Sequence, residues 1–154
     1  MNFVQNLINN QTTNFYYLQV SMDDHQAHYS HIKHDTDTKL SQLDILNQFH
    51  LLLNSKQIAL KQVRIKRNLF LVAFDISKSK AKIFTNTNGK YYIHRQLIFC
   101  RKDSTTGLLT SLSLADAKLI ASAAGNISDS YNYGFWTIQF DAIIDINSGK
   151  NILN

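Results

Sequence analysis

The chain alternates between segments with a two-residue hydrophobic period and segments with a helical period, and this pattern predicts its elements. Residues 14–22 alternate apolar and polar side chains, which is typical of a strand. Residues 39–53 carry leucine, isoleucine and phenylalanine at helical spacing, with Asp37 or Thr38 placed to cap the helix. Between them, the polar segment 23–38 is expected to be a loop rich in histidine and aspartate.

The middle of the chain has the pattern of a sheet. Apolar and basic residues alternate over 63–66, and the continuous apolar run 69–74 is typical of a strand buried on both faces. Lysine recurs at every second position over 78–82, so in a strand these lysines would share a face. The dipeptide Asn88-Gly89 is a strong hairpin signal, and a further strand is predicted over residues 91–101.

The last third of the chain predicts one helix and one strand. Ser113 is placed to cap a short alanine-rich helix over 114–124, which Gly125 would end. Residues 136–146 alternate regularly and predict the final strand. The first residues, 1–13, are expected to form a short helix or a flexible terminus.

The element order β-α-β-β-β-α-β predicts a single α+β domain over residues 1–154. We expect a mostly antiparallel sheet of about four to five strands with two helices packed on one face. The length of 154 residues and a hydrophobic content of 44% suit one core.

Charge changes the picture because it is concentrated. Twelve of the sixteen basic residues lie between Lys56 and Lys102, where Asp75 is the single acid, so this window has a net charge of +11. The segments on either side each carry −3. Such a positive field attracts polyanions: nucleic acid, an acidic protein surface or an anionic membrane.

The window predicts a basic sheet face that bears tyrosine and contacts phosphates of RNA or DNA. Cations that neutralise phosphates beside rings that stack on bases are typical of single-stranded nucleic-acid surfaces. The residues expected to make these contacts are Arg64, Lys66, Lys78, Lys80, Lys82, Lys90, Tyr92 and Arg95.

Three other interpretations stay open. The basic face would also suit an interaction or inhibitor protein, for example from a mobile element, that docks on an acidic partner. It would also suit a merely solvated surface. The third is a small nuclease whose acid/base pair would be His94 with either His50 or a histidine from the 25–34 segment, although His50 beside an apolar stripe is typical of a core or boundary residue. We expect a binding protein rather than an enzyme, and no cofactor.

A histidine run follows the first predicted strand. His25, His28, His31 and His34 recur at every third residue, flanked by aspartates. On a helix His28 and His31 would be neighbours and suit zinc, whereas on a strand they would alternate between faces. A solvated loop is the simpler interpretation, and a pH-responsive element is another.

Composition also excludes several classes. The chain has no glutamate, which excludes His-Glu metalloprotease motifs and glutamate-based acid/base pairs. Cys100 is the single cysteine, so an internal disulfide and a multi-cysteine zinc site are excluded. No apolar stretch is long enough to span a bilayer and no secretory signal is recognised, so we expect a cytoplasmic protein without membrane attachment.

Overall fold

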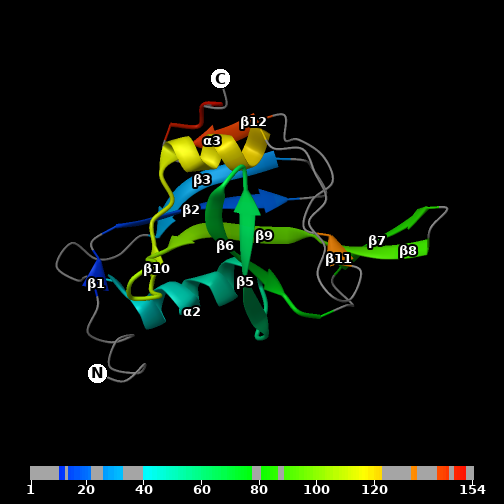
Figure 1. The fold of residues 1–154 in the computed structure, drawn as a ribbon, viewed down its shortest axis with the longest axis horizontal. Helices are drawn as coiled ribbons and strands as arrows, with labels where there is room; N and C mark the ends of the chain where they lie inside the picture. The colour runs from blue at the N-terminus through cyan, green and yellow to red at the C-terminus, as the bar shows by residue number, and fades with distance from the viewer. Residues whose placement is uncertain are drawn as a thin grey trace.

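In the computed structural model of the chain, the described residues are 11–12, 14–21, 26–32, 40–77, 81–86, 89–122, 133–134, 142–145 and 148–151. The main sheet has seven strands, more than the four or five expected. Six lie side by side (Figure 1), in the order β12 (Ala142–Asp145), β3 (Gln26–Ile32), β2 (Phe15–Ser21), β9 (Gln96–Lys102), β6 (Asn68–Asp75) and β5 (Ile58–Ile65). The seventh, β10 (Leu109–Thr110), pairs with β9. All pairs are antiparallel except β12 with β3, so the predicted α+β class is confirmed.

The sheet is buried on both faces at its centre. Along β9, Leu97 and Phe99 belong to one core cluster, and Ile98 and Cys100 belong to a second cluster on the opposite face. Helix α3 (Leu114–Ser122) contributes Ala117, Ile120 and Ala121 to the first cluster. Helix α2 (Gln42–Leu52) contributes Ile45 and Phe49 to the second. The expectation of two helices on one face is therefore wrong, because strands with apolar side chains on both faces need a covering element on each side.

Both helices begin at a serine cap. Asp44 donates its N–H to Ser41 Oγ at 3.1 Å, and its carboxylate accepts the Ser41 N–H at 3.0 Å, which is a capping box. Helix α2 therefore begins about one turn after the predicted Asp37 or Thr38 cap, because Leu40 lies in the short strand β4 (Leu40–Ser41), paired with β1 (Gln11–Thr12). The predicted Ser113 cap of α3 is confirmed, since Ser113 Oγ accepts the Asp116 N–H at 3.1 Å. The predicted end of this helix at Gly125 lies outside the described residues.

The loop expected over 23–38 is wrong for its central part, which is strand β3. This strand pairs with β2 over seven residues and with β12 over four. Pairing on both sides stabilises a strand whose own sequence is polar, which illustrates how tertiary context overrides β-propensity.

The strand expected over 91–101 is two strands separated at Arg95. Strand β8 (Gly89–His94) pairs with β7 (Ala81–Asn86), which confirms the predicted hairpin, and with β11 (Tyr133–Gly134) in a separate three-stranded sheet. After Arg95 the chain continues as β9 in the main sheet. Of the strand predicted over 136–146, the described part is β12. In the described part of the chain, no helix is long and apolar enough to cross a bilayer.

Candidate polyanion-binding surface

The β5–β6 hairpin ends in a turn made of two basic residues. Ile65 pairs with Asn68, so Lys66 and Arg67 alone connect the strands. Both have positive φ angles, 47° and 77°. Turns of this kind match the twist of the strands and favour Asn-Gly, because residues with a larger side chain clash with the backbone in this region. The turn therefore places two cations where local conformational preference selects against lysine and arginine.

Arg64, Lys66 and Arg67 form what we call the basic tip. All three side chains are exposed. Within the described ranges, none of them forms an ion pair with a carboxylate. Arg64 Nη1 donates to the Arg67 carbonyl at 3.5 Å, a long contact that leaves its other donors facing solvent. Residues 56–74 contain no acid, so nothing in these two strands offsets the charge of the tip before Asp75.

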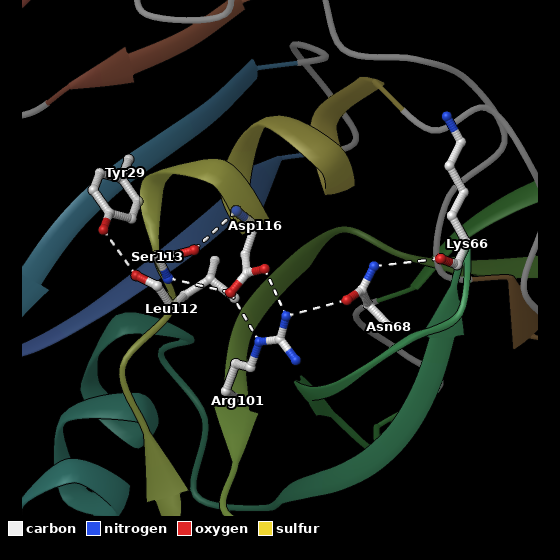
Figure 2. Close-up of polar contacts among 7 residues, drawn as sticks. All are labelled: Tyr29, Lys66, Asn68, Arg101, Leu112, Ser113 and Asp116. Carbon is white, nitrogen blue, oxygen red and sulfur yellow. Dashed lines mark hydrogen bonds and ion pairs between the residues drawn. The ribbon is translucent and has the colours of Figure 1, made fainter.

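A chain of polar contacts holds the base of the tip (Figure 2). Asn68 donates its side-chain N–H to the Lys66 carbonyl at 3.3 Å, and its Oδ1 accepts from Arg101 Nη2 at 3.4 Å. Arg101 in turn donates to both carboxylate oxygens of Asp116, at 2.8 and 2.7 Å. The same guanidinium lies 4.8 Å from the centroid of the Phe70 ring. These contacts connect the turn to the first turn of helix α3.

Arg101 belongs to this support and not to the anion-binding set. Hydrogen bonds from the Arg101 guanidinium lower the pKa of Asp116 below the ordinary value of an aspartate, while burial acts in the opposite direction. The same hydrogen bonds raise the pKa of Arg101. The Asp116 side chain is 14% exposed and that of Arg101 33%. Asp116 and Asn68 together engage three of the five guanidinium N–H donors, and the carboxylate offsets the positive charge that would attract a phosphate.

The β7–β8 hairpin carries three further predicted contact residues, Lys82, Lys90 and Tyr92, in a sheet separate from the tip. Its register pairs Lys82 with Ile93 and Lys90 with Thr85. Paired residues share a face and successive residues alternate, so the positions of Lys82 and Lys90 lie on opposite faces of the hairpin. The expectation of one shared lysine face is wrong for this pair, because a two-residue turn always pairs an even-numbered residue with an odd-numbered one. The position of Tyr92 shares the face of Lys90.

The remaining predicted contact residues are spread along the chain. Lys78 and Lys80 lie outside the described residues. Arg95 is exposed at the bend between β8 and β9. The predicted set therefore does not form one continuous sheet face: Arg64 and Lys66 lie at the end of the main sheet, and the β7–β8 residues lie in the other sheet.

His28 and His31 both lie on strand β3, three residues apart, so they are on opposite faces of the sheet. The His31 ring centroid lies 5.3 Å from that of Tyr16, which stacks on Tyr29 at 5.6 Å. The strand does not bring the two histidines together as a metal site. Across the described ranges, no group of three histidine, cysteine or aspartate side chains is arranged to hold a metal ion.

His50 lies in the last turn of α2, and its Nδ1 is 2.9 Å from the Ser55 carbonyl. A carbonyl only accepts, so this contact puts the proton on Nδ1 and ties the ring to the loop that follows the helix. This is the boundary role expected of His50. The ring lines an open hollow of about 840 Å³ with Leu51, Asn54, Ser55, Lys56, Gln57, Asp75 and Ser77. His94 lies on β8.

The predicted contact set left out three residues of this surface: Arg67 in the tip, and Asn68 and Arg101 beneath it. The available signal was spacing, since only Lys66, Arg67 and Asn68 lie between a strand ending at Ile65 and the apolar run that begins at Leu69. The chain lacks the usual Asn-Gly at this turn, so the hairpin is not apparent from composition. The Arg101–Asp116 pair joins residues fifteen apart and has no sequence signal.

Comparisons with family models, with curated proteins and with solved structures found no match to this chain.

Proposed function

We propose that this chain binds RNA or DNA without catalysing a reaction, through phosphate contacts made by the basic tip. The observation that carries the proposal is the Lys66-Arg67 turn. Left-handed backbone costs about 1–2 kcal/mol for each residue other than glycine, and strained conformations of this kind cluster at functional sites. An Asn-Gly turn would have neither the strain nor the charge. The strained turn therefore carries two cations where uncharged residues would be more stable.

The chemistry of the tip suits phosphate. A guanidinium presents a planar fork that matches two phosphate oxygens, and an ammonium acts as a compact charge. Arg64, Lys66 and Arg67 supply both kinds within four residues, on a turn supported by Asn68. The proposed second contact region consists of Lys78, Lys80, Lys82, Lys90, Tyr92 and Arg95, in which Tyr92 would stack on a base.

The test is a fluorescence-polarisation titration at low salt with labelled single-stranded RNA, single-stranded DNA and duplex DNA. The informative variant is Lys66→Asn/Arg67→Gly, because it removes two cations while installing the preferred turn residues. Each lost phosphate contact is expected to weaken binding by about 1 kcal/mol, so the double variant should bind about thirtyfold more weakly. The same variant should unfold at an equal or higher temperature than the wild type.

A charge-matched control distinguishes binding at the tip from electrostatic attraction by the net charge of the protein. Lys118→Gln/Lys150→Gln removes two positive charges outside the 56–102 window. We expect this variant to bind within about threefold of the wild type, because neither lysine belongs to the basic tip or to the second contact region. Equal losses in the two variants would contradict a site at the tip, and saturable binding to none of the three nucleic acids would end the proposal.

We also propose a cytoplasmic location. The single thiol, Cys100, is buried and free, which is compatible with a reducing compartment.

A further inference from the structure

Strand β5 is the last strand of the main sheet, and among the described residues no strand pairs with its outer edge, which we call the open edge. It pairs with β6 over all eight residues, from Ile58 with Asp75 to Ile65 with Asn68, without a bulge. No proline interrupts it. A regular strand of this length, about 26 Å, presents a long edge, and natural sheets usually shorten, bulge or cover such an edge.

The geometry of the hairpin identifies which backbone groups point outward. The residues that flank a two-residue turn exchange both hydrogen bonds, and bonded pairs then alternate down the ladder. The backbone groups of Ile65 and every second residue before it therefore face β6. The Ile76 N–H donates to the Gln57 carbonyl at 3.2 Å, which continues the inward series. The outward residues are Ile58, Leu60, Gln62 and Arg64.

These four outward residues offer four N–H donors and four carbonyl acceptors. Within the described part of the chain, no backbone hydrogen bond engages them on that side. Backbone groups of this kind hold an added strand in β-augmentation. The edge is therefore a ready template for a further strand.

The side chains along this edge select the chemistry of an added strand. Lys61 and Arg64 lie on β5, and Lys66 and Arg67 follow directly. No acid occurs from Lys56 to Phe74. On the face of the outward residues, Leu60 is 41% exposed and offers an apolar contact beside the charge of Arg64. Successive side chains of a strand point to opposite faces, so an extended segment that carries acidic side chains on the face of Arg64 complements this charge.

We propose that the open edge of β5 binds an extended acidic segment of a partner protein, which adds to the main sheet as a further strand. The ladder hydrogen bonds supply the affinity, and the basic tip selects acidic side chains. This interaction goes beyond nucleic-acid binding, because it needs the backbone edge, which phosphate contacts do not use. The two ligands share Arg64, so they compete.

A second copy of the chain does not fit this edge. Two β5 strands side by side would bring the cations of one copy close to those of the other, because neither strand carries an acid. Like charges facing each other across a strand pair destabilise it. Lysine on an edge strand is a common guard against such self-pairing.

The probe is a fluorescein-labelled octapeptide of alternating glutamate and valine, titrated against the full chain at low salt. An octapeptide of alternating lysine and valine should not bind. The decisive comparison is the acidic peptide N-methylated at every residue, which keeps its charges but has no N–H to donate. Loss of ladder hydrogen bonds should weaken binding by at least about tenfold. Equal affinity of the two acidic peptides, or no binding of the parent peptide, overturns the proposal.

A matched variant tests the same edge from the protein side. Gln62→Pro removes one outward N–H while leaving the inward ladder and the charge unchanged, and proline is tolerated on an edge at such a position. It should weaken binding of the acidic peptide about tenfold and leave nucleic-acid binding within about twofold. Gln62→Thr keeps the N–H and should bind the peptide as the wild type does.

The outcomes separate this inference from the proposed function. Peptide binding that needs the N–H groups, together with no nucleic-acid binding, would support the edge and end the nucleic-acid proposal. Should Gln62→Pro alter the circular dichroism spectrum, the N-methylated peptide against wild-type protein decides instead. A dimer in sedimentation that Gln62→Pro dissociates would overturn the proposal, because the edge would then bind a second copy.

Discussion

For the Asp116→Asn variant, charge alone and the contacts beneath the tip predict opposite changes in the affinity for a polyanion. Asp116 accepts two short hydrogen bonds from Arg101, which in turn donates to Asn68, the residue that holds the Lys66 carbonyl. An asparagine keeps one acceptor oxygen and turns an amide toward the guanidinium. Charge alone predicts tighter binding of a polyanion, because a carboxylate has been removed. The contacts predict weaker binding, because the turn loses its support.

The expected loss in the free energy of unfolding lies between two limits. Exposed ion pairs contribute about 0–1 kcal/mol, and breaking a buried pair costs about 3–5 kcal/mol. The Asp116 and Arg101 side chains are 14% and 33% exposed, so we expect a loss of about 2 kcal/mol in the free energy of unfolding at pH 7. The contacts at 3.3 and 3.4 Å are long, so their loss should weaken nucleic-acid binding by only about threefold.

The pH dependence of this stability loss follows from the direction of the Asp116 pKa shift. The folded protein lowers the pKa of Asp116 below its ordinary value of 3.8. Its ion pair therefore contributes fully above about pH 4, and the contribution is lost as the pH falls through the lower, folded-state value. Urea denaturation of both proteins from pH 7 to pH 3 should show the difference in unfolding free energy shrinking below about pH 4.

The matched control is Asp103→Asn, which makes the same change in net charge outside these contacts. The Asp103 carboxylate accepts from the N–H groups of Thr105 and Thr106, and an asparagine oxygen can still accept there. We expect Asp103→Asn to bind nucleic acid as tightly as the wild type or slightly more tightly. Tighter binding by Asp116→Asn as well would refute the reasoning, as would a stability difference that stays constant down to pH 3.

Two further predictions concern the core. The Gln42 side chain is buried and exchanges two hydrogen bonds with the Leu109 backbone, at 2.9 and 2.8 Å; Gln42→Ala leaves both groups unsatisfied and should lower the free energy of unfolding by about 2–4 kcal/mol. Urea denaturation measures this loss, and a loss below about 0.5 kcal/mol would contradict the buried pairing. Burial raises the pKa of the fully buried Cys100 thiol, so a thiol reagent at pH 8 should label it only as fast as the protein unfolds. Complete labelling of the native protein within seconds would contradict that burial.

Sequence patterns predict those elements whose own residues match their environment. The apolar run 69–74 indicates β6, and Ser113 indicates the start of α3. The second apolar run, Leu97 to Cys100, contained the signal for burial on both faces, which the placement of both helices on one face did not use. Strand β3 escaped prediction because its pairing with β2 and β12, and not its polar sequence, stabilises it.

The surface follows the same division. The concentration of charge is apparent from the sequence, but its distribution over two sheets depends on pairing between distant strands. The opposite faces of Lys82 and Lys90 follow from turn length and were available from the sequence. For the tip the sequence offers only spacing, because its turn lacks Asn-Gly, and its support depends on Arg101 and Asp116, which meet only in the folded protein.

Phosphate contact by Lys66 and Arg67 is tested most directly by the salt dependence of binding. The logarithm of the binding constant falls linearly with the logarithm of the salt concentration, by about 0.7 for each phosphate neutralised on a single strand and about 0.9 on a duplex. If both side chains contact phosphates, the Lys66→Asn/Arg67→Gly slope should be smaller than the wild-type slope by about 1.4 on a single strand or about 1.8 on a duplex. Equal slopes for the two proteins would show that neither cation contacts a phosphate and would contradict the proposed function of the tip.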